Sequence, residues 1–296
     1  MRLLVTGAAG FLGSRTAELV EREGHDVVRV TRPGGAQRLG TPDAVKVNAG
    51  DPLIRDLLVG ADAVFHFAGV PDPTRSRADP ARALRENVGT TVNLLEGCAE
   101  HGAGLVYPST VRAAQDPLPD AYALSKRLGE LACELHPAPA TVVRLTSVFG
   151  PGQVAWEGAT GAIAAFAARA LSGEPIVVYG NPERARDFLY VDDLVPGLAA
   201  LVKDSEWNQT VTAASGASTP LLRTAELVRE AAGSEVPIET PGGDLDPGEN
   251  ESYAADGSTP RLPLSVRPLE DAIRTYVDWL RSHPAAQGRA ASRPAR

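Results

Sequence analysis

The sequence has little cysteine, and its two cysteines lie far apart. Cys98 and Cys133 are the only thiols among 296 residues, and neither belongs to a Cys-x-x-Cys pair. A disulfide framework or a zinc site needs several cysteines or histidines at close spacing. The five histidines are scattered, at positions 25, 66, 101, 136 and 283. The sequence therefore predicts buried, reduced thiols and no metal centre.

Long apolar runs and an excess of basic residues are also missing. No stretch approaches the roughly twenty apolar residues of a membrane span. The opening run Leu3-Leu4-Val5 is too short for a secretory signal and is followed at once by glycines. The net charge is -8, whereas a nucleic-acid binder needs an excess of Lys and Arg to neutralise phosphates. We therefore expect a cytoplasmic protein that binds neither membrane nor nucleic acid.

The first half of the chain alternates short β-rich runs with helical stretches. Apolar residues make up 43% and charged residues 22% of the chain, an ordinary globular composition. Strands are expected at residues 2–6, 26–31, 45–47, 63–67, 105–107 and 141–145, and helices at 13–23, 52–58, 82–100 and 122–135. Such alternation predicts an α/β Rossmann fold, a doubly wound parallel sheet with helices on both faces.

The pattern becomes more irregular after Gly150-Pro151-Gly152, although helices return at 194–203, 221–232 and 269–281. We expect residues 1–150 to form a dinucleotide-binding Rossmann domain. Residues 151–283 would form a smaller, mainly substrate-binding C-terminal region, with some segments returning to the Rossmann core. The tail, residues 284–296, has almost no apolar surface to bury and is predicted to be disordered.

A glycine-rich run between the first strand and the first helix predicts a dinucleotide site. Gly7, Gly10 and Gly13 follow a G-x-x-G-x-x-G spacing, with Phe11 and Leu12 between the last two. Gly7 would permit a tight turn, Gly10 a close approach of backbone to a pyrophosphate, and Gly13 close helix–strand contact. The N-terminus of the following helix offers N–H groups and a positive dipole end to the phosphates.

The end of the second strand bears on the choice between NAD and NADP. NAD-binding proteins usually place Asp or Glu there to hold the ribose hydroxyls. This chain has Thr31 and then Arg32, with Arg38 as a second cation. A neutral hydroxyl would not repel a 2′-phosphate, and an arginine could pair with one. The sequence slightly favours NADP, the alternative being that Arg32 is an ordinary solvated loop residue.

Two further segments are expected to contact the cofactor. Phe67-Ala68-Gly69 ends the fourth strand, where small residues let the backbone lie against a ligand. Asn48 follows the third strand, where a side chain that contacts adenine is expected, with Asp51 as a competitor. His66 is interpreted as structural rather than catalytic.

The candidate catalytic residues are two hydroxyls, a phenol and a lysine. Tyr122 and Lys126 are four apart on a predicted helix and so lie on one face of it. An ammonium beside a phenol favours the phenolate and so provides a proton donor and acceptor usable near neutral pH. Lys126 could also hydrogen-bond the nicotinamide ribose. Ser109 and Thr110 end the fifth strand, where a hydroxyl can hydrogen-bond a reacting carbonyl or alcohol.

Taken together, these motifs resemble the extended short-chain dehydrogenase/reductases, in the NAD-dependent epimerase/dehydratase group that includes UDP-galactose 4-epimerase and sugar-nucleotide 4-ketoreductases. The resemblance covers about residues 1–282. It is carried by segments 6–13, 66–69, 87–91, 109–110, 122–126, 144–151 and 186–193.

The resemblance implies a role for each matching residue. The matches are Thr110 to the catalytic Ser/Thr, Tyr122 to the acid/base, Lys126 to the ribose-binding lysine, Asn87 to an active-site asparagine, Ser147 to a substrate-side position and Arg186 to an arginine that holds the nucleotide diphosphate. The alternative for Arg186 is a salt bridge to Asp187 or Asp193. The resemblance also implies a homodimer in which the helices at 82–100 and 122–135 pair across a two-fold axis.

The chain departs from the family pattern at four points. The spacing from Thr110 to Tyr122 is short, and Ala113-Ala114 stands where an aromatic often occurs. Val111-Arg112 replaces the Asp-Glu pair of the 4,6-dehydratases, so elimination of water would lack its acid and base. Asp246 stands in the place of a second phosphate-binding arginine. The loss of the Asp-Glu pair excludes the dehydratase reaction. For position 246 there are two alternatives: another arginine compensates, with Arg261 and Arg184 as candidates, or the substrate is not a nucleoside diphosphate in the usual pose.

The expected function is therefore NAD(P)-dependent hydride transfer at a sugar carbon, C4, of a nucleotide-sugar, as in a 4-epimerase. The alternatives are an NADPH-dependent 4-ketoreductase of a nucleotide-ketosugar, a reductase of a smaller carbonyl compound, and a catalytically silent dinucleotide-binding protein. Thr31 and Arg32 favour a ketoreductase, whereas the segment around Arg186 favours an epimerase.

Overall fold

The structure is a computed structural model that describes residues 1–34, 44–71, 73–157, 161–243, 252, 257 and 259–284. The chain divides into two compact units. Unit 1 comprises Met1–Leu145, Leu194–Ala213 and Ala255–Leu264, and unit 2 comprises Thr146–Asp193, Ala214–Ala254 and Ser265–Arg296. Arg38, Asp246 and residues 285–296, on which sequence predictions were made, lie outside the described residues.

Unit 1 is built on a seven-stranded sheet in the order β10-β6-β5-β4-β1-β2-β3. Its strands are β1 (Arg2–Thr6), β2 (Asp26–Thr31), β3 (Val45–Lys46), β4 (Ala63–His66), β5 (Gly104–Thr110), β6 (Ala140–Leu145) and β10 (Gln209–Ala213). Every pairing in this sheet is parallel. The strand order reverses between β1 and β4, so the predicted Rossmann fold is confirmed, and ligands of such sheets bind at this reversal, outside the carboxyl ends of the strands.

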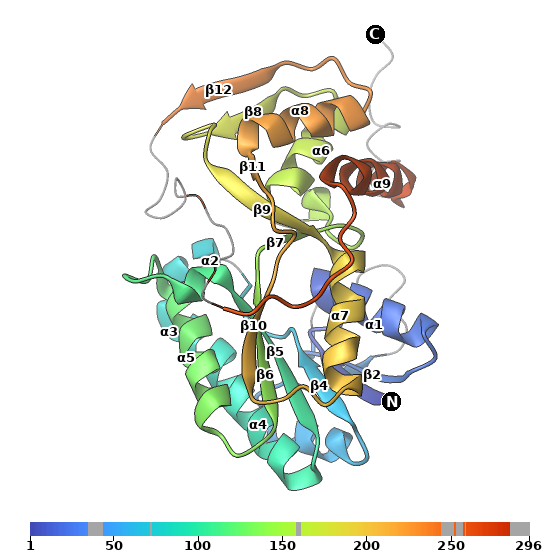
Figure 1. Cartoon of the computed structure of the whole chain (residues 1–296), viewed down its shortest axis with the longest axis vertical. Helices are drawn as coiled ribbons and strands as arrows, with labels where there is room; N and C mark the ends of the chain where they lie inside the picture. The colour runs from blue at the N-terminus through green and yellow to red at the C-terminus, as the bar shows by residue number, and fades with distance from the viewer. Residues whose placement is uncertain are drawn as a thin grey trace. The chain divides into compact units, whose positions relative to one another are not determined.

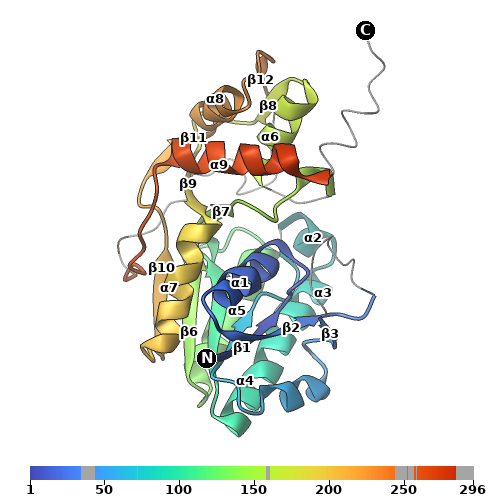
Figure 2. The ribbon, with the colours of Figure 1, turned by 90° about the vertical axis from the view of Figure 1, so that its right-hand side faces the viewer.

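Helices cover both faces of the unit 1 sheet. The helical elements are α1 (Phe11–Arg22), η1 (Pro52–Leu58), α2 (Pro73–Ala78), α3 (Pro80–Leu84), η2 (Arg85–Gly89), α4 (Thr90–His101), η3 (Val111–Ala114), α5 (Ala121–Leu135) and α7 (Val191–Lys203). Helices α3, α4 and α5 lie on one side of the sheet, and α1 lies with α7 on the other (Figure 1 and Figure 2). The core lies between the sheet and the helices that cover it. Leu4, Leu94 and Leu105 are fully buried there.

Most elements of unit 1 lie within two residues of their predicted bounds, and two differ more. The strand expected at 105–107 runs over Gly104–Thr110, and all seven of its residues are buried because β4 and β6 flank it on both sides. The helix expected at 82–100 is divided into α3, a π-helical turn and α4. Such π-turns frequently occur at functional sites, and this one contains Asn87.

Unit 2 has two small sheets. Strands β11 (Ser218–Pro220), β9 (Ala185–Tyr190) and β7 (Ser147–Phe149) form one, and β12 (Ile238–Gly242) pairs with β8 (Ile176–Tyr179) in the other. Helices α6 (Ala162–Ser172), α8 (Leu221–Ala231) and α9 (Leu269–Ser282) complete the unit, with a short turn, η4, at Ala155–Glu157. Aromatic rings fill its core: Phe149 lies 5.5 Å from Tyr190 and 6.0 Å from Tyr276 between centroids.

The sequence reading missed α6 and the short strands of unit 2. Helix α6 is apolar almost throughout and shows little helical alternation between polar and apolar residues. The strands have only three to six residues, so any alternation in them is short. Among the residues that the structure describes, no helix combines the length and apolarity needed to cross a membrane.

Candidate active site

The glycine run forms a tight cradle at the carboxyl ends of β1 and β4. Gly7 has φ of +66°, and a Cβ there would lie 2.7 Å from the carbonyl carbon of Phe67. A Cβ on Gly13 would lie 2.3 Å from the carbonyl oxygen of Gly7. Gly10 donates its N–H to that same oxygen at 2.8 Å. Larger residues would therefore force the strand, the turn and the helix apart.

The start of α1 is suited to receive phosphate. Gly10, at the N-cap, is exposed, and no side chain caps the helix. The first turn, which contains Phe11 and Leu12, has no acidic residue. Uncapped N–H groups and the helix dipole attract an anion. The cradle thus fits the diphosphate of a dinucleotide.

The expected adenine-ribose end begins after β2 and β3. Thr31 is buried at the end of β2 and pairs with Lys46 of β3, whereas Arg32 is exposed. Asn48 lies just beyond β3, and its Oδ1 accepts the N–H of Gly50 at 3.1 Å. The three residues predicted to contact this part of the cofactor thus lie at the ends of two adjacent strands.

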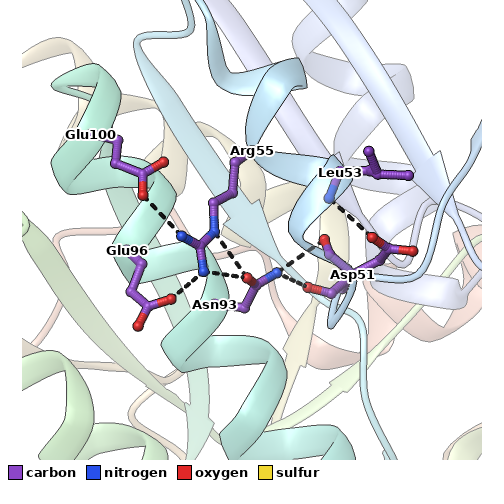
Figure 3. A network of polar contacts seen from close by, with 7 residues as sticks. Asp51, Leu53, Arg55, Asn93, Glu96 and Glu100 are labelled. Carbon is purple, nitrogen blue, oxygen red and sulfur yellow. Dashed lines mark hydrogen bonds and ion pairs between the residues drawn. The ribbon is translucent and has the colours of Figure 1, made fainter.

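A polar network on α4 holds the loop that follows Asn48 (Figure 3). Asn93 donates from Nδ2 to the carbonyl oxygens of Ala49 at 2.9 Å and Asp51 at 3.2 Å. The guanidinium of Arg55 in turn donates to Oδ1 of Asn93 at 3.0 and 2.8 Å.

Two carboxylates of α4 complete this network. Arg55 pairs with Glu96 and, at 2.8 Å, with Glu100. Asp51 caps η1 by accepting the N–H of Leu53 at 3.0 Å (Figure 3). The loop beside Asn48 is therefore fixed from both η1 and α4.

The contacts of His66 favour the structural role interpreted from the sequence. Its ring is buried and bridges Oγ1 of Thr6 at 2.8 Å and Oγ1 of Thr90 at 3.2 Å. Burial, with the nearby charge of Lys126, lowers the pKa of His66 to about 3. Thr6 also accepts the N–H of Ala68 at 3.2 Å, which holds the segment after β4 against β1.

Asn87 connects that segment to the helix that carries the predicted catalytic pair. Its Oδ1 accepts the N–H of Val70 at 2.7 Å, and its Nδ2 donates to Oγ of Ser125 at 2.8 Å. A Cβ on Gly69 would lie 2.4 Å from Oδ1 of Asn87, so the carboxamide packs directly on this backbone. Ser125 lies between Tyr122 and Lys126 on α5, and donates to the carbonyl oxygen of Tyr122 at 2.8 Å.

The two neighbouring hydroxyls at the end of β5 have different partners. Ser109 is buried and donates to Oε1 of Glu130 at 2.6 Å. Thr110 caps η3, since its Oγ1 accepts the N–H of Arg112 at 3.3 Å. A hydroxyl that accepts a backbone N–H keeps its own proton for donation to another oxygen.

Tyr122 and Lys126 occupy the first two turns of α5. Tyr122 is half-buried. Nζ of Lys126 donates to the carbonyl oxygen of Pro108 at 2.8 Å and lies 4.8 Å from the ring centroid of Tyr107. Burial lowers the pKa of Lys126 to about 8, although Cys133 and Glu130 favour the charged form. Lys126 is thus held against the end of β5, two residues from Thr110.

Glu130 is a buried carboxylate that joins α5 to β5 and β6. Arg144 binds it with both arms of its guanidinium, at 3.0 and 2.7 Å, and Arg127 donates at 2.9 Å. Burial opposes the charge, but the hydrogen bonds from Arg144, Ser109 and Arg127 outweigh it and keep the pKa of Glu130 below its ordinary value. The carboxylate therefore remains ionised in the core.

The two predicted substrate-side residues lie in unit 2. Ser147 begins β7 and Arg186 lies in the neighbouring strand β9, where Ser147 pairs with Phe188. The guanidinium of Arg186 donates to the carbonyl oxygen of Ala185 at 3.0 Å. Both residues therefore belong to one three-stranded sheet.

The carboxylates that compete for Arg186 have other donors. Asp187 accepts the N–H groups of Ser215 and Gly216, both at 2.8 Å. Asp193 accepts the N–H and the guanidinium of Arg267, at 3.0 and 2.8 Å. Each carboxylate therefore has donors besides any contact that Arg186 makes.

Several residues that shape the site were not predicted. They are Arg112, Asp120, Glu130, Arg144 and Asn93. Asp120 could have been found, because an aspartate just before a helical run is a typical N-cap. Glu130 follows Lys126 by one helical turn, which also marks it as a neighbour. Arg144 and Asn93 contact the site from distant segments and have no local signal, and Arg112 adjoins Thr110 in a loop where an arginine is ordinarily solvated.

The chain is similar to known proteins over most of its length. A model of the NAD-dependent epimerase/dehydratase family matches residues 3–211. The chain is 28% identical over 260 residues to UDP-glucuronic acid decarboxylase 1 of Xenopus tropicalis, covering 79% of this chain and 61% of that protein. It is 26% identical over 322 residues to an uncharacterised UDP-glucose epimerase of Bacillus subtilis, covering 95% and 98%.

A solved structure gives the same result. The UDP-glucose 4-epimerase of Thermus thermophilus, in complex with NAD, superposes with a TM-score of 0.77 at 25% identity, covering 95% of this chain and 99% of that one. The chain spans less than two thirds of the Xenopus decarboxylase, so that relative does not define its activity. The family match covers most of the chain and confirms the resemblance: the chain belongs to the NAD-dependent epimerase/dehydratase family.

Proposed function

We propose that this protein transfers a hydride to and from C4 of the sugar in a nucleotide-sugar, as a 4-epimerase. The observation that carries the proposal is the contact of Lys126 with Pro108 of β5, two residues from Thr110, in the same unit as the glycine cradle. The similarity to UDP-glucose epimerases supports the substrate class.

In this proposal, different residues of the chain bind the cofactor and transfer the proton. Gly7, Gly10 and Gly13 would hold the cofactor diphosphate, and Lys126 its nicotinamide ribose. The nicotinamide, when bound, supplies the hydride acceptor and donor. Tyr122 would take the proton of the sugar hydroxyl as the hydride leaves and return it when the carbonyl is reduced.

Thr110 and Arg186 would orient the substrate. The Thr110 hydroxyl, held by the N–H of Arg112, would donate a hydrogen bond to the reacting oxygen as it gains carbonyl character. Arg186 would bind the nucleotide diphosphate with its forked guanidinium, and Ser147 would contact the substrate. Binding energy at the diphosphate would hold the sugar in its reactive pose.

An NADPH-dependent 4-ketoreductase is the second candidate. The observation in its favour is that β2 ends at Thr31, followed by the exposed Arg32, with no carboxylate at this point to hold the ribose hydroxyls of NAD. NADP is slightly favoured on this ground, although the Thermus epimerase structure holds NAD.

We also propose a homodimer built on α4 and α5. Four apolar side chains of these helices are exposed: Leu124 by 38%, Leu128 by 37%, Leu135 by 82% and Val92 by 37%. Leu124, Leu128 and Leu135 recur at intervals of four and seven, which places them on one face of α5. A self-complementary patch of this kind suits a two-fold axis.

The proposed function is tested by identifying the cofactor and the product. The purified protein is denatured, and any released nucleotide is identified by mass. Wild type and Tyr122→Phe are then incubated with UDP-glucose and UDP-galactose, and C4 inversion is followed by NMR. Tightly bound NAD(H) and inversion by wild type alone would support an epimerase.

Other outcomes would redirect the assignment. An empty site, with NADPH consumed only in the presence of a nucleotide-4-ketosugar, would establish the ketoreductase. Turnover of small carbonyl compounds but of no nucleotide-sugar would overturn the substrate class. Cofactor binding with no turnover of any of these substrates would leave a catalytically silent dinucleotide-binding protein.

A further inference from the structure

The two groups proposed to act on the reacting oxygen come from different elements joined by a short connection. Thr110 ends β5, and Tyr122 is the second residue of α5. Between them, η3 occupies Val111–Ala114. The relative position of hydroxyl and phenol therefore depends on how this connection is held.

At the first end of the connection, the Thr110 side chain is fixed by the backbone of Arg112. Oγ1 of Thr110 accepts the Arg112 N–H at 3.3 Å and so caps η3. Because η3 begins directly after the strand, its first turn determines where this hydroxyl is held. Movement of Arg112 would move the donor to which Thr110 is bound.

At the other end, Asp120 fixes the start of α5. Its Oδ1 accepts the N–H of Ala123 at 2.8 Å, and it is the N-cap residue. Tyr122 lies inside that capped turn. The position of the phenol therefore depends on Asp120 in the same way as the hydroxyl depends on Arg112.

An ion pair joins the two ends. The guanidinium of Arg112 donates to Oδ2 of Asp120, and the two side chains are only 11% and 5% exposed. Asp120 thus uses one oxygen for the helix and the other for Arg112. A buried pair contributes little net stability, since desolvation of the charges offsets their attraction. The effect of this ion pair that concerns the site is the geometry it imposes, since it connects η3 to the start of α5.

We propose that Arg112 is a positioning residue that, through Asp120, holds the Thr110 hydroxyl and the Tyr122 phenol at a fixed separation. The inference rests on the proposed function for its effect on turnover. By the resemblance, Arg112 stands in the place of the second residue of the Asp-Glu pair of the dehydratases.

The experiment compares Arg112→Lys, Arg112→Met, Asp120→Asn and the double variant Arg112→Met/Asp120→Asn with wild type. Arg112→Met is expected to lower kcat by about ten- to a hundredfold, because a displacement on the order of 1 Å has effects of this size. KM for the sugar and the cofactor affinity should change less than about threefold. Arg112→Lys keeps the charge but not the fork and should recover part of the loss.

Because Arg112 and Asp120 form one ion pair, the effects of their substitutions on kcat should not be additive. Asp120→Asn keeps an oxygen to cap α5 and should resemble Arg112→Met. The double variant should be no worse than either single variant, since both remove one interaction. It also removes both buried charges, so it remains folded if a single variant with an unpaired charge does not. Arg82→Met, which breaks an exposed pair with Glu86, is the matched control and should keep wild-type kcat.

Amide hydrogen exchange measured by NMR separates this inference from the proposed function. In Arg112→Met, the N–H groups of residues 112 and 123 should exchange faster than in wild type, whether or not a substrate is known. Unchanged exchange at both amides, or a wild-type kcat in Arg112→Met, would overturn the positioning role. Faster exchange in a protein whose wild type turns over no nucleotide-sugar would support the link and overturn only the proposed function.

Discussion

Ser109 and Glu130 are joined by a 2.6 Å hydrogen bond that ties the end of β5 to the middle of α5. Successive residues of a strand point to opposite faces of its sheet. Ser109 therefore points toward the carboxylate under α5, whereas its neighbour Thr110 is bound to the N–H of Arg112. Of the two hydroxyls that the sequence offered as catalytic, this arrangement favours Thr110.

The first prediction separates the two hydroxyls. Thr110→Val should lower kcat by about a hundredfold or more, the usual cost of losing one donor to a developing oxyanion. Ser109→Ala should leave kcat within about threefold but lower the free energy of unfolding by about 1–3 kcal/mol, because buried Glu130 loses a donor. Steady-state kinetics and urea denaturation measure both. A Ser109→Ala protein that is stable but inactive would contradict this division of roles.

The second prediction concerns the pH dependence introduced by Lys126. Its pKa is lowered from 10.5 to about 8, chiefly by burial. Between these values the unfolded chain holds a proton that the native protein has released, so stability rises with pH by at most about 1.4 kcal/mol per unit. This gain is complete above pH 10.5 and is lost as the pH falls through 8.

The Lys126→Met variant lacks the titrating group and therefore lacks this rise in stability with pH. Urea denaturation at pH 7 and pH 10 should show wild type gaining stability relative to the variant by about 1–3 kcal/mol. The kcat of wild type should fall as the pH rises above about 8, because the ammonium that favours the Tyr122 phenolate is lost. A difference between the two proteins that does not change with pH would show that Lys126 titrates normally.

The third prediction is that Arg32 selects the cofactor. A charge-assisted contact to the 2′-phosphate contributes about 1.5–3 kcal/mol, or roughly ten- to a hundredfold in Kd. Wild type should therefore bind NADPH more tightly than NADH, and Arg32→Ala should lose this preference while its affinity for NADH stays the same. Fluorescence titration of both cofactors decides the matter. If wild type prefers NADH, Arg32 is a solvated loop residue.

The fourth prediction concerns Arg186 as the anchor of the diphosphate. Arg186→Ala should weaken the binding of UDP-sugars by about tenfold or more and leave cofactor affinity intact. Arg186→Lys should recover only part of the loss, since an ammonium cannot fork onto two phosphate oxygens. Calorimetry with UDP-glucose and with the cofactor provides the test. Equal binding of UDP-glucose by wild type and the alanine variant would reject the anchor.

The fifth prediction tests the dimer. Leu128→Glu places a charge at the centre of the exposed apolar face of α5, where burial without a partner is costly. Light scattering at micromolar concentration should give a dimer for wild type and a monomer for the variant, with unchanged circular dichroism. Leu53→Glu, at an exposed apolar residue of η1, is the control and should stay dimeric. A monomeric wild type would refute the proposed interface.

The sequence alone determined those features whose geometry is local. A G-x-x-G-x-x-G run between a strand and a helix predicts a tight turn with close backbone packing, and the structure shows Gly7 and Gly13 packed at backbone distance. Residues four apart on a helix share a face, which identified Tyr122 and Lys126 as a pair. The alternation of strands and helices likewise predicted the parallel sheet.

Only the tertiary structure decided which of these residues act together. Glu130 meets Ser109 from 21 residues away because β5 and α5 pack against one another, and Arg144 joins them because β6 is the next strand. Neither contact leaves a periodic trace in the sequence. The same holds for the link between Arg112 and Asp120. From the sequence, two charged residues in a loop are expected to be solvated, whereas the structure buries both side chains. Spacing along the chain determines local geometry, whereas strand order and burial determine which distant polar groups must satisfy one another.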